Sequence, residues 1–98
     1  MLYSEHHQPT SPDELVTRVS GIVVRCAELG QAATGISAHT NLWDAGMDSM
    51  SIVRIVVAIE DEFELEFAQD LLVRNTFDSI DSISTAVAKM LDGARERR

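Results

Sequence analysis

The segment from residue 49 to residue 63 constrains the fold most, because its apolar residues recur at a helical spacing. One series lies three, four or seven positions apart and comprises Ile52, Ile55, Val56, Ile59 and Phe63. That spacing puts these residues on one face of an α-helix. A second series, Met50, Val53 and Val57, falls on a different side. We therefore predict a helix from about Ser49 to Glu62, apolar over most of its circumference, that contacts a partner.

An earlier helix is predicted from about residue 12 to residue 29. In the stretch SPDEL, Ser11 can cap the helix, Pro12 suits its first position, and Glu14 completes a capping box. Apolar residues then follow at helical spacing: Leu15, Val19, Ile22, Val23 and Cys26. Gly30 is the expected end of this helix.

A last helix is predicted to begin near Asp78 or Ser79 and to end at Gly93. Its apolar series is Ile80, Ile83, Val87, Met90 and Leu91. A short helical turn is expected before it, near residues 70–74. The stretch EDEFELEF alternates acidic and apolar residues, which is typical of a strand, but no second strand is evident to pair with it. We interpret it as a helix exit whose apolar residues fill the core.

The composition favours an all-α fold in one small domain. The chain has 98 residues, 45% of them hydrophobic but only 5% aromatic, so the core must be aliphatic. We predict a bundle of three main helices plus one short helix, with a long loop between the first two. Residues 1–10 are predicted to be a disordered arm, residues 11–93 the folded domain, and residues 94–98 a charged tail.

The charge and the cysteine content exclude several kinds of protein. The net charge of −8 argues against nucleic-acid binding, which needs a basic patch, and favours partners with basic surfaces. The single cysteine, Cys26, permits no internal disulfide and no cysteine-based zinc site, and we expect it to be a buried structural thiol. No metal site is predicted. No apolar run reaches the ~20 residues of a membrane span, and no secretion signal is evident, so we expect a cytoplasmic protein that binds no membrane.

The loop from residue 30 to residue 48 is long beside the usual median of ~4–6 residues. It carries Ile36, Leu42 and Trp43, which are apolar enough to anchor it on the core. Long anchored loops of this kind are often functional. We expect Trp43 to be the main anchor, with a hydrogen-bond partner for its indole N–H.

Asp48 and Ser49 stand where this loop meets the helix, and two interpretations of them are compatible. Either residue type is favoured as a helix cap. A serine hydroxyl at a helix N-terminus is also well placed to carry a phosphate. A catalytic serine with His39 and Asp44 is a poor alternative, because the Gly-x-Ser-x-Gly elbow is absent. A calcium loop counted from Asp44 fails at its third and twelfth positions.

The stretch DAGMDSMSIVRIVVAIEDEF closely resembles the modification site and second helix of acyl carrier proteins, whose motif is Asp-x-Gly-x-Asp-Ser-Leu/Met. The resemblance extends over roughly residues 12–92. It implies that a phosphopantetheinyl transferase moves 4′-phosphopantetheine from coenzyme A onto Ser49. It also implies that Asp48 helps to seat the transferase with Mg²⁺ and coenzyme A. The thiol of the arm would hold acyl or aminoacyl groups as thioesters, so the chain is expected to be a carrier and not an enzyme.

The same resemblance implies a partner surface and a set of partners. The surface corresponds to the second helix and the loop before it, here Met47, Met50, Val53, Arg54 and Val57. Besides the transferase, the expected partners are an adenylating acyl or aminoacyl ligase or an acyltransferase, and a downstream synthase or transferase. We expect a monomer.

Three positions depart from the commonest pattern of the family. Ala45 stands where leucine is usual, Trp43 where a small or polar residue is common, and Arg54 where fatty-acid carriers tend to have glutamate. The Gly-Gly-His/Asp-Ser motif of peptidyl carriers is also absent. We therefore favour a free-standing carrier of a specialised pathway, of polyketide, non-ribosomal peptide or aminoacyl-transfer type, loaded with an amino acid or a related acid. The alternatives are a fatty-acid carrier and an acidic helical adaptor without a cofactor.

Overall fold

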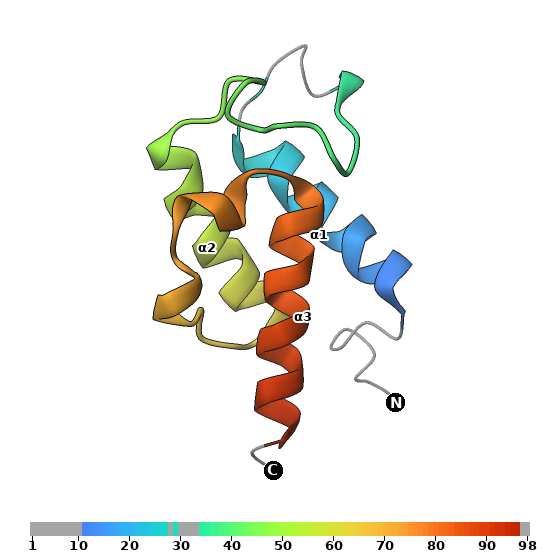
Figure 1. Cartoon of the computed structure of the whole chain (residues 1–98), viewed down its shortest axis with the longest axis vertical. Coiled ribbons are helices and arrows are strands. Elements are labelled where there is room, and N and C mark those ends of the chain that lie inside the picture. Colours follow the sequence, from blue (N-terminus) through green and yellow to red (C-terminus); the bar gives the residue numbers. More distant parts are fainter. Residues whose placement is uncertain (1–10, 28, 30–33, 97–98) are drawn as a thin grey trace.

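A computed structural model describes residues 11–27, 29 and 34–96, and three α-helices form its framework (Figure 1). They are α1 (Pro12–Ala27), α2 (Ser49–Phe63) and α3 (Ile80–Glu96). Two short 3₁₀ helices, η2 (Gln69–Leu71) and η3 (Arg74–Phe77), lie between α2 and α3. The described residues contain no strand, which confirms the all-α prediction. The single short helix expected near residues 70–74 is instead these two turns.

The start of α1 follows the predicted cap. Ser11 Oγ accepts a hydrogen bond of 3.1 Å from the backbone N–H of Glu14, which satisfies one of the unpaired amides of the first turn. The described part of the helix ends at Ala27, two residues before the predicted end. Gly30, the expected terminator, lies outside the described residues, as do the predicted arm of residues 1–10 and the last two residues of the predicted tail.

The exit of α2 explains the alternating acids and apolar residues. Glu64 adopts the left-handed conformation (φ 55°, ψ 52°) that ends the helix, and its N–H donates to the carbonyl of Glu60. The turned chain buries Phe63 and Phe67 and half-buries Leu65. Glu60 Oε2 accepts a 2.9 Å hydrogen bond from the N–H of Phe67, which secures the exit. The predicted helix exit is confirmed.

The two ends of α3 differ in how well the sequence predicted them. At its start, Ser79 and Ser82 exchange hydrogen bonds: each hydroxyl accepts from the other residue's N–H, at 3.1 and 3.0 Å. This is a capping box with serine in both places. At its end the prediction was wrong, because the helix passes through Gly93 and continues to Glu96. A glycine inside a helix costs only about 1 kcal/mol relative to alanine, and the residues after it are good helix formers.

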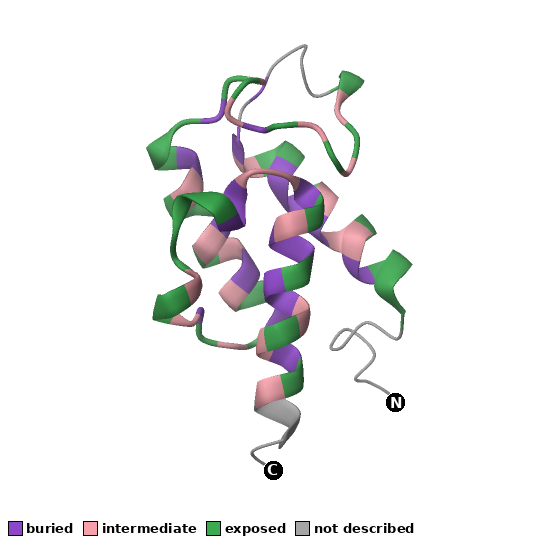
Figure 2. Ribbon diagram, viewed as in Figure 1, coloured by how far each residue is buried: buried purple, intermediate pink, exposed green. Residues whose placement is uncertain are grey.

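The core is aliphatic with a few phenylalanines, as the composition indicates. α1 packs against both α2 and α3, and η3 packs against α3. All three helices carry buried residues at intervals along their length (Figure 2). Those with essentially no exposed surface are Val19, Ile22, Val23, Leu42, Ile55, Ile59, Phe63, Ile83 and Val87. Cys26 is half-buried against this core instead of fully buried. Within the described residues, no helix is both long and apolar enough to cross a membrane.

The long loop is anchored to the start of α3. Leu42 is completely buried, and its N–H donates to the carbonyl of Asp78 at 2.8 Å. In a second hydrogen bond of 2.8 Å, the N–H of Asp81 donates to the carbonyl of Ala38. The loop therefore arches over one end of the bundle (Figure 1) and delivers the chain to the first residue of α2. This confirms the predicted anchoring.

Candidate functional site

Ser49 is the first residue of α2, and the turn before it is set by the backbone. Gly46 has a φ of 115°, a conformation that residues with a Cβ rarely adopt. The chain then turns Met47 into the core and continues through Asp48 in an extended conformation. Ser49 itself is exposed. The Gly-x-Asp-Ser spacing thus reflects a tight turn that leaves the serine at the surface.

Asp48 is the N-cap of α2, as one of the two interpretations predicted. Its Oδ1 accepts hydrogen bonds from the N–H of Ser51 at 3.0 Å and from Ser51 Oγ at 2.9 Å. These two bonds hold the pKa of the Asp48 carboxyl below its usual value, mainly through the Ser51 amide, and the positive charge of Arg54 adds to the effect. The carboxylate is therefore ionised at neutral pH and is directed at the helix terminus.

Ser51 is a positioning residue that the sequence analysis missed. Its side chain is buried, and its Oγ lies 3.3 Å from the carbonyl oxygen of Ala27, at the end of α1. The single hydroxyl proton is shared between this carbonyl and the Asp48 carboxylate. Ser51 therefore joins the start of α2 to the end of α1. The Asp-x-x-Ser spacing resembles a capping box and could have drawn attention to it.

Ser49 lines a small hollow in the surface. Its hydroxyl forms no hydrogen bond with another described residue. The hollow has a volume of about 220 Å³ and lies between α2 and the segment around η3. Its walls are Trp43, Ser49, Ile52, Leu72, Val73, Arg74 and Phe77. A group attached at Ser49 would therefore start beside a largely apolar recess.

Trp43 stands in the wall of this hollow and is held from two sides. Its Nε1 donates a 3.2 Å hydrogen bond to Asp78 Oδ1, which confirms the expected partner for the indole. The guanidinium of Arg74 lies 3.9 Å from the ring centroid. Sequence reasoning missed Arg74 and Asp78, because both contacts join residues more than thirty positions apart. A pattern among neighbouring residues cannot predict a contact over such a separation in sequence.

The predicted partner surface on α2 is exposed, with one correction. Met50, Val53 and Val57 have 58%, 55% and 58% of their surface exposed, and Arg54 lies among them. Met47 does not belong to this surface, because only 5% of it is exposed and it packs in the core. Its N–H donates to the carbonyl of Leu42, and the turn at this bond directs the side chain inward.

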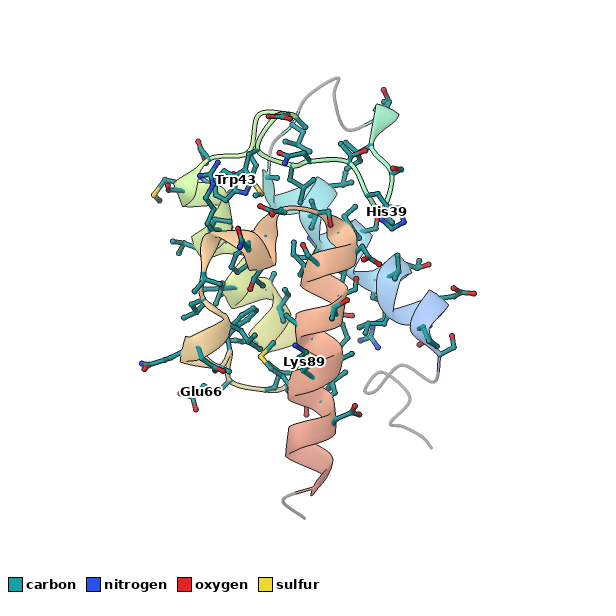
Figure 3. All side chains as sticks on the ribbon, viewed as in Figure 1. His39, Trp43, Glu66 and Lys89 are labelled. Atoms are coloured by element: carbon teal, nitrogen blue, oxygen red, sulfur yellow. The ribbon has the colours of Figure 1, made fainter. Side chains whose placement is uncertain are left out.

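The structure does not assemble the alternative catalytic serine site. His39 lies at the far side of the loop from Trp43 (Figure 3), in a turn where its N–H donates to Ser37 Oγ. Asp44 uses its own N–H to donate to Asn41 Oδ1 within another turn. Among the described residues, neither side chain forms a hydrogen bond with Ser49. Ser49, His39 and Asp44, the catalytic alternative that the sequence already disfavoured, therefore do not form a triad.

The match to a protein family decides what kind of site this is. The family described as "Phosphopantetheine attachment site" matches residues 22–87, a range that includes Ser49 and all of α2. The chain belongs to this family of carrier proteins. Its cofactor is covalently attached 4′-phosphopantetheine, and the carrier itself is not a catalyst. The cofactor-free adaptor considered above is therefore not supported.

Three similar proteins match most of this chain. An aminoacyl carrier protein of Agrobacterium fabrum is 33% identical over 72 residues, which cover 74% of this chain and 87% of the relative. A chain in the crystal structure of an engineered Bradyrhizobium japonicum glycine:[carrier protein] ligase, complexed with carrier protein from Agrobacterium tumefaciens and AMP, is 29% identical. It has a TM-score of 0.69 and covers 74% of this chain and 97% of its own. A solution structure from A. tumefaciens is 30% identical with a TM-score of 0.67, covering 83% and 98%.

Proposed function

We propose that Ser49 is the residue that receives 4′-phosphopantetheine and that the arm carries an aminoacyl group as a thioester. The observation that supports this most is the position of Ser49. It is exposed, it begins α2, and it lies in the part of the chain that matches the phosphopantetheine family. Asp48 caps the start of α2, so the Ser49 hydroxyl is not needed as a cap and is available to be modified.

The chemistry of attachment suits this position. Ser49 Oγ forms a bond to the phosphorus that bears the pantetheine, while the pyrophosphate bond of coenzyme A breaks and adenosine 3′,5′-bisphosphate leaves. The hydroxyl proton passes to a base of the phosphopantetheinyl transferase. The product is a phosphodiester, and the partial positive charge at the start of α2 favours its negative charge. Asp48, the residue directly before Ser49, is proposed to help seat Mg²⁺ and coenzyme A in the transferase complex.

The thioester-forming thiol comes from the arm and not from the chain. The protein's single cysteine, Cys26, is half-buried in α1 and packs against the core. An arm with its own terminal thiol lets the carrier present a reactive group while its own surface stays inert. This division of labour fits a small protein that carries intermediates between enzymes.

An aminoacyl cargo is favoured over a fatty-acyl one by the similar proteins. One relative is an aminoacyl carrier protein, and one neighbour comes from a complex with a glycine:[carrier protein] ligase. We infer that an adenylating ligase loads this chain, and that it docks on Met50, Val53, Arg54 and Val57. The positive charge of Arg54 on that face suits a ligase whose surface presents carboxylates there.

Intact mass spectrometry tests the attachment site. After incubation with coenzyme A, Mg²⁺ and a broad-range phosphopantetheinyl transferase, the wild type should gain the mass of one phosphopantetheine. Ser49→Ala should gain none. Ser51→Ala is the matched control, since it removes the hydroxyl of the next serine along the chain and should still be modified. An unmodified wild type, or a modified Ser49→Ala, contradicts the proposal.

The cargo is tested on the protein purified from its native host. Mildly acidic conditions preserve thioesters, so the intact mass then shows what the arm carries. An increment equal to an amino acid residue, removed by hydroxylamine, supports the aminoacyl assignment. A fatty-acyl increment would instead favour the alternative carrier.

A further inference from the structure

The hollow beside Ser49 has a fixed positive charge in its wall. Arg74 lines the hollow together with Ser49 and Ile52. Its guanidinium lies 3.9 Å from the centroid of the Trp43 ring, close enough for a cation–π contact. Asp78 in turn holds the indole through its 3.2 Å hydrogen bond. These contacts connect Asp78, Trp43 and Arg74, and they hold a cation in the wall of the hollow that Ser49 also lines.

Arginine characteristically stacks flat on aromatic faces, and a distance of 3.9 Å from Cζ to the Trp43 centroid suits such a contact, which uses a face of the guanidinium and not its edge. The N–H donors of arginine lie in the plane of the group, so they point outward around the ring contact. Arg74 forms no ion pair with any carboxylate of the described residues, whereas Arg18 is paired with Glu62. Arg74 thus retains a planar set of donors that matches the geometry of phosphate oxygens.

A phosphodiester at Ser49 would meet a strongly acidic protein. The net charge is −8, and Asp48 and Asp44 stand in the turn that leads to Ser49. These negative charges disfavour a further negative charge, and a neighbouring cation offsets them. Among the described residues that line the hollow, Arg74 is the one cation. Arg54, the other candidate, lies on the exposed face of α2 and does not line it.

We propose that Arg74 binds the phosphate of the arm attached at Ser49, with Trp43 as the positioning residue that presents it. This inference rests on the proposed attachment at Ser49. The contact holds the first part of the arm against the hollow between α2 and η3. Trp43, which departs from the family pattern, thereby acquires a role beyond anchoring the loop.

The experiment compares thermal unfolding of each variant before and after attachment of the arm. In the wild type, Arg74 offsets the new negative charge, so the melting temperature should change little on attachment. In Arg74→Gln and Arg74→Met the same attachment should lower it by about 2–5 °C. Each variant is compared with and without the arm, so any purely structural effect of the substitution cancels. Arg74→Met keeps an apolar stem over Trp43, so a result is available even if the glutamine variant folds poorly.

Matched controls define what would overturn the proposal. Lys89→Gln removes one exposed positive charge at a position distant from Trp43 (Figure 3) and should behave like the wild type. Arg74→Lys keeps the positive charge, so attachment should lower its melting temperature less than that of Arg74→Gln. Intact mass first confirms that each sample is fully modified, so a failure of attachment is distinguished from a failure of this contact. Equal shifts in the wild type, Arg74→Gln and Arg74→Met would overturn the proposal. So would a lowered melting temperature on attachment in Arg54→Gln and not in these two Arg74 variants.

Discussion

The two faces of α2 are built from the same kinds of residue, yet the fold treats them in opposite ways. Ile55, Ile59 and Phe63 are essentially inaccessible to solvent, whereas Met50, Val53 and Val57 each leave more than half of their surface exposed. Both series have a helical spacing, so periodicity alone does not tell them apart. The difference arises because α1 covers only one side of α2. An apolar face that remains uncovered in a stable small domain is typical of a surface that meets partners.

The largest effect is expected from removing a side chain on the buried face. Ile59→Ala should destabilise the fold by about 2–5 kcal/mol, because it removes apolar contacts and leaves a cavity. Val57→Ala, two residues earlier in the same helix but on its exposed face, should change stability by less than about 0.5 kcal/mol. Chemical denaturation of both variants measures this contrast. Equal losses would mean that the two faces do not differ energetically.

The same contrast exists between the two serines at the start of α2. Ser51 is buried between Asp48 and the Ala27 carbonyl, while Ser49 is exposed. We expect Ser51→Ala to cost about 1 kcal/mol, since a buried hydrogen bond is lost. Ser49→Ala should leave the denaturation midpoint nearly unchanged while abolishing modification. A Ser51→Ala protein as stable as the wild type would remove the proposed link between the two helices.

Reversing the charge on the exposed face should separate docking from folding. Arg54→Glu is expected to change stability by less than about 0.5 kcal/mol. It should nevertheless alter the kcat/KM of loading by the ligase that acts on this carrier, because the docking charge is inverted. Arg54→Gln, which only neutralises the charge, should give an intermediate value. Unchanged loading by both variants would place Arg54 outside the interface.

The smallest effect is expected in how the stability of the fold depends on pH below neutral. The Asp48 carboxyl has a lowered pKa in the folded chain, so its cap contributes stability above its unfolded pKa of 3.8. That contribution is lost as the pH falls through the still lower folded value. Denaturation of the wild type and Asp48→Asn, followed from neutral pH down through about 4, should therefore show the two curves converging at acid pH. Curves that stay parallel would show that Asp48 does not titrate with folding.

Local sequence patterns were enough to predict most of the fold and part of the site. The start of α1, the start of α2, the exit through Glu64 and the anchored loop all follow from caps and apolar spacing within a few residues. The end of α3 was missed because Gly93 is a stop signal only when the following residues cannot continue the helix. Met47 was misplaced because the motif indicates which residues are near the serine but not which way each side chain turns.

The sequence by itself determined that this chain is a small helical carrier, because helical periodicity, capping residues and the Asp-Ser-Met motif are encoded by neighbours along the chain. Only the tertiary structure decided which apolar face of α2 is covered, that Met47 is buried, and that Ser51 joins two helices. It also decided that Arg74, Trp43 and Asp78 meet beside Ser49. These are contacts between residues far apart in sequence, and they exist only once packing has brought the helices and the loop together.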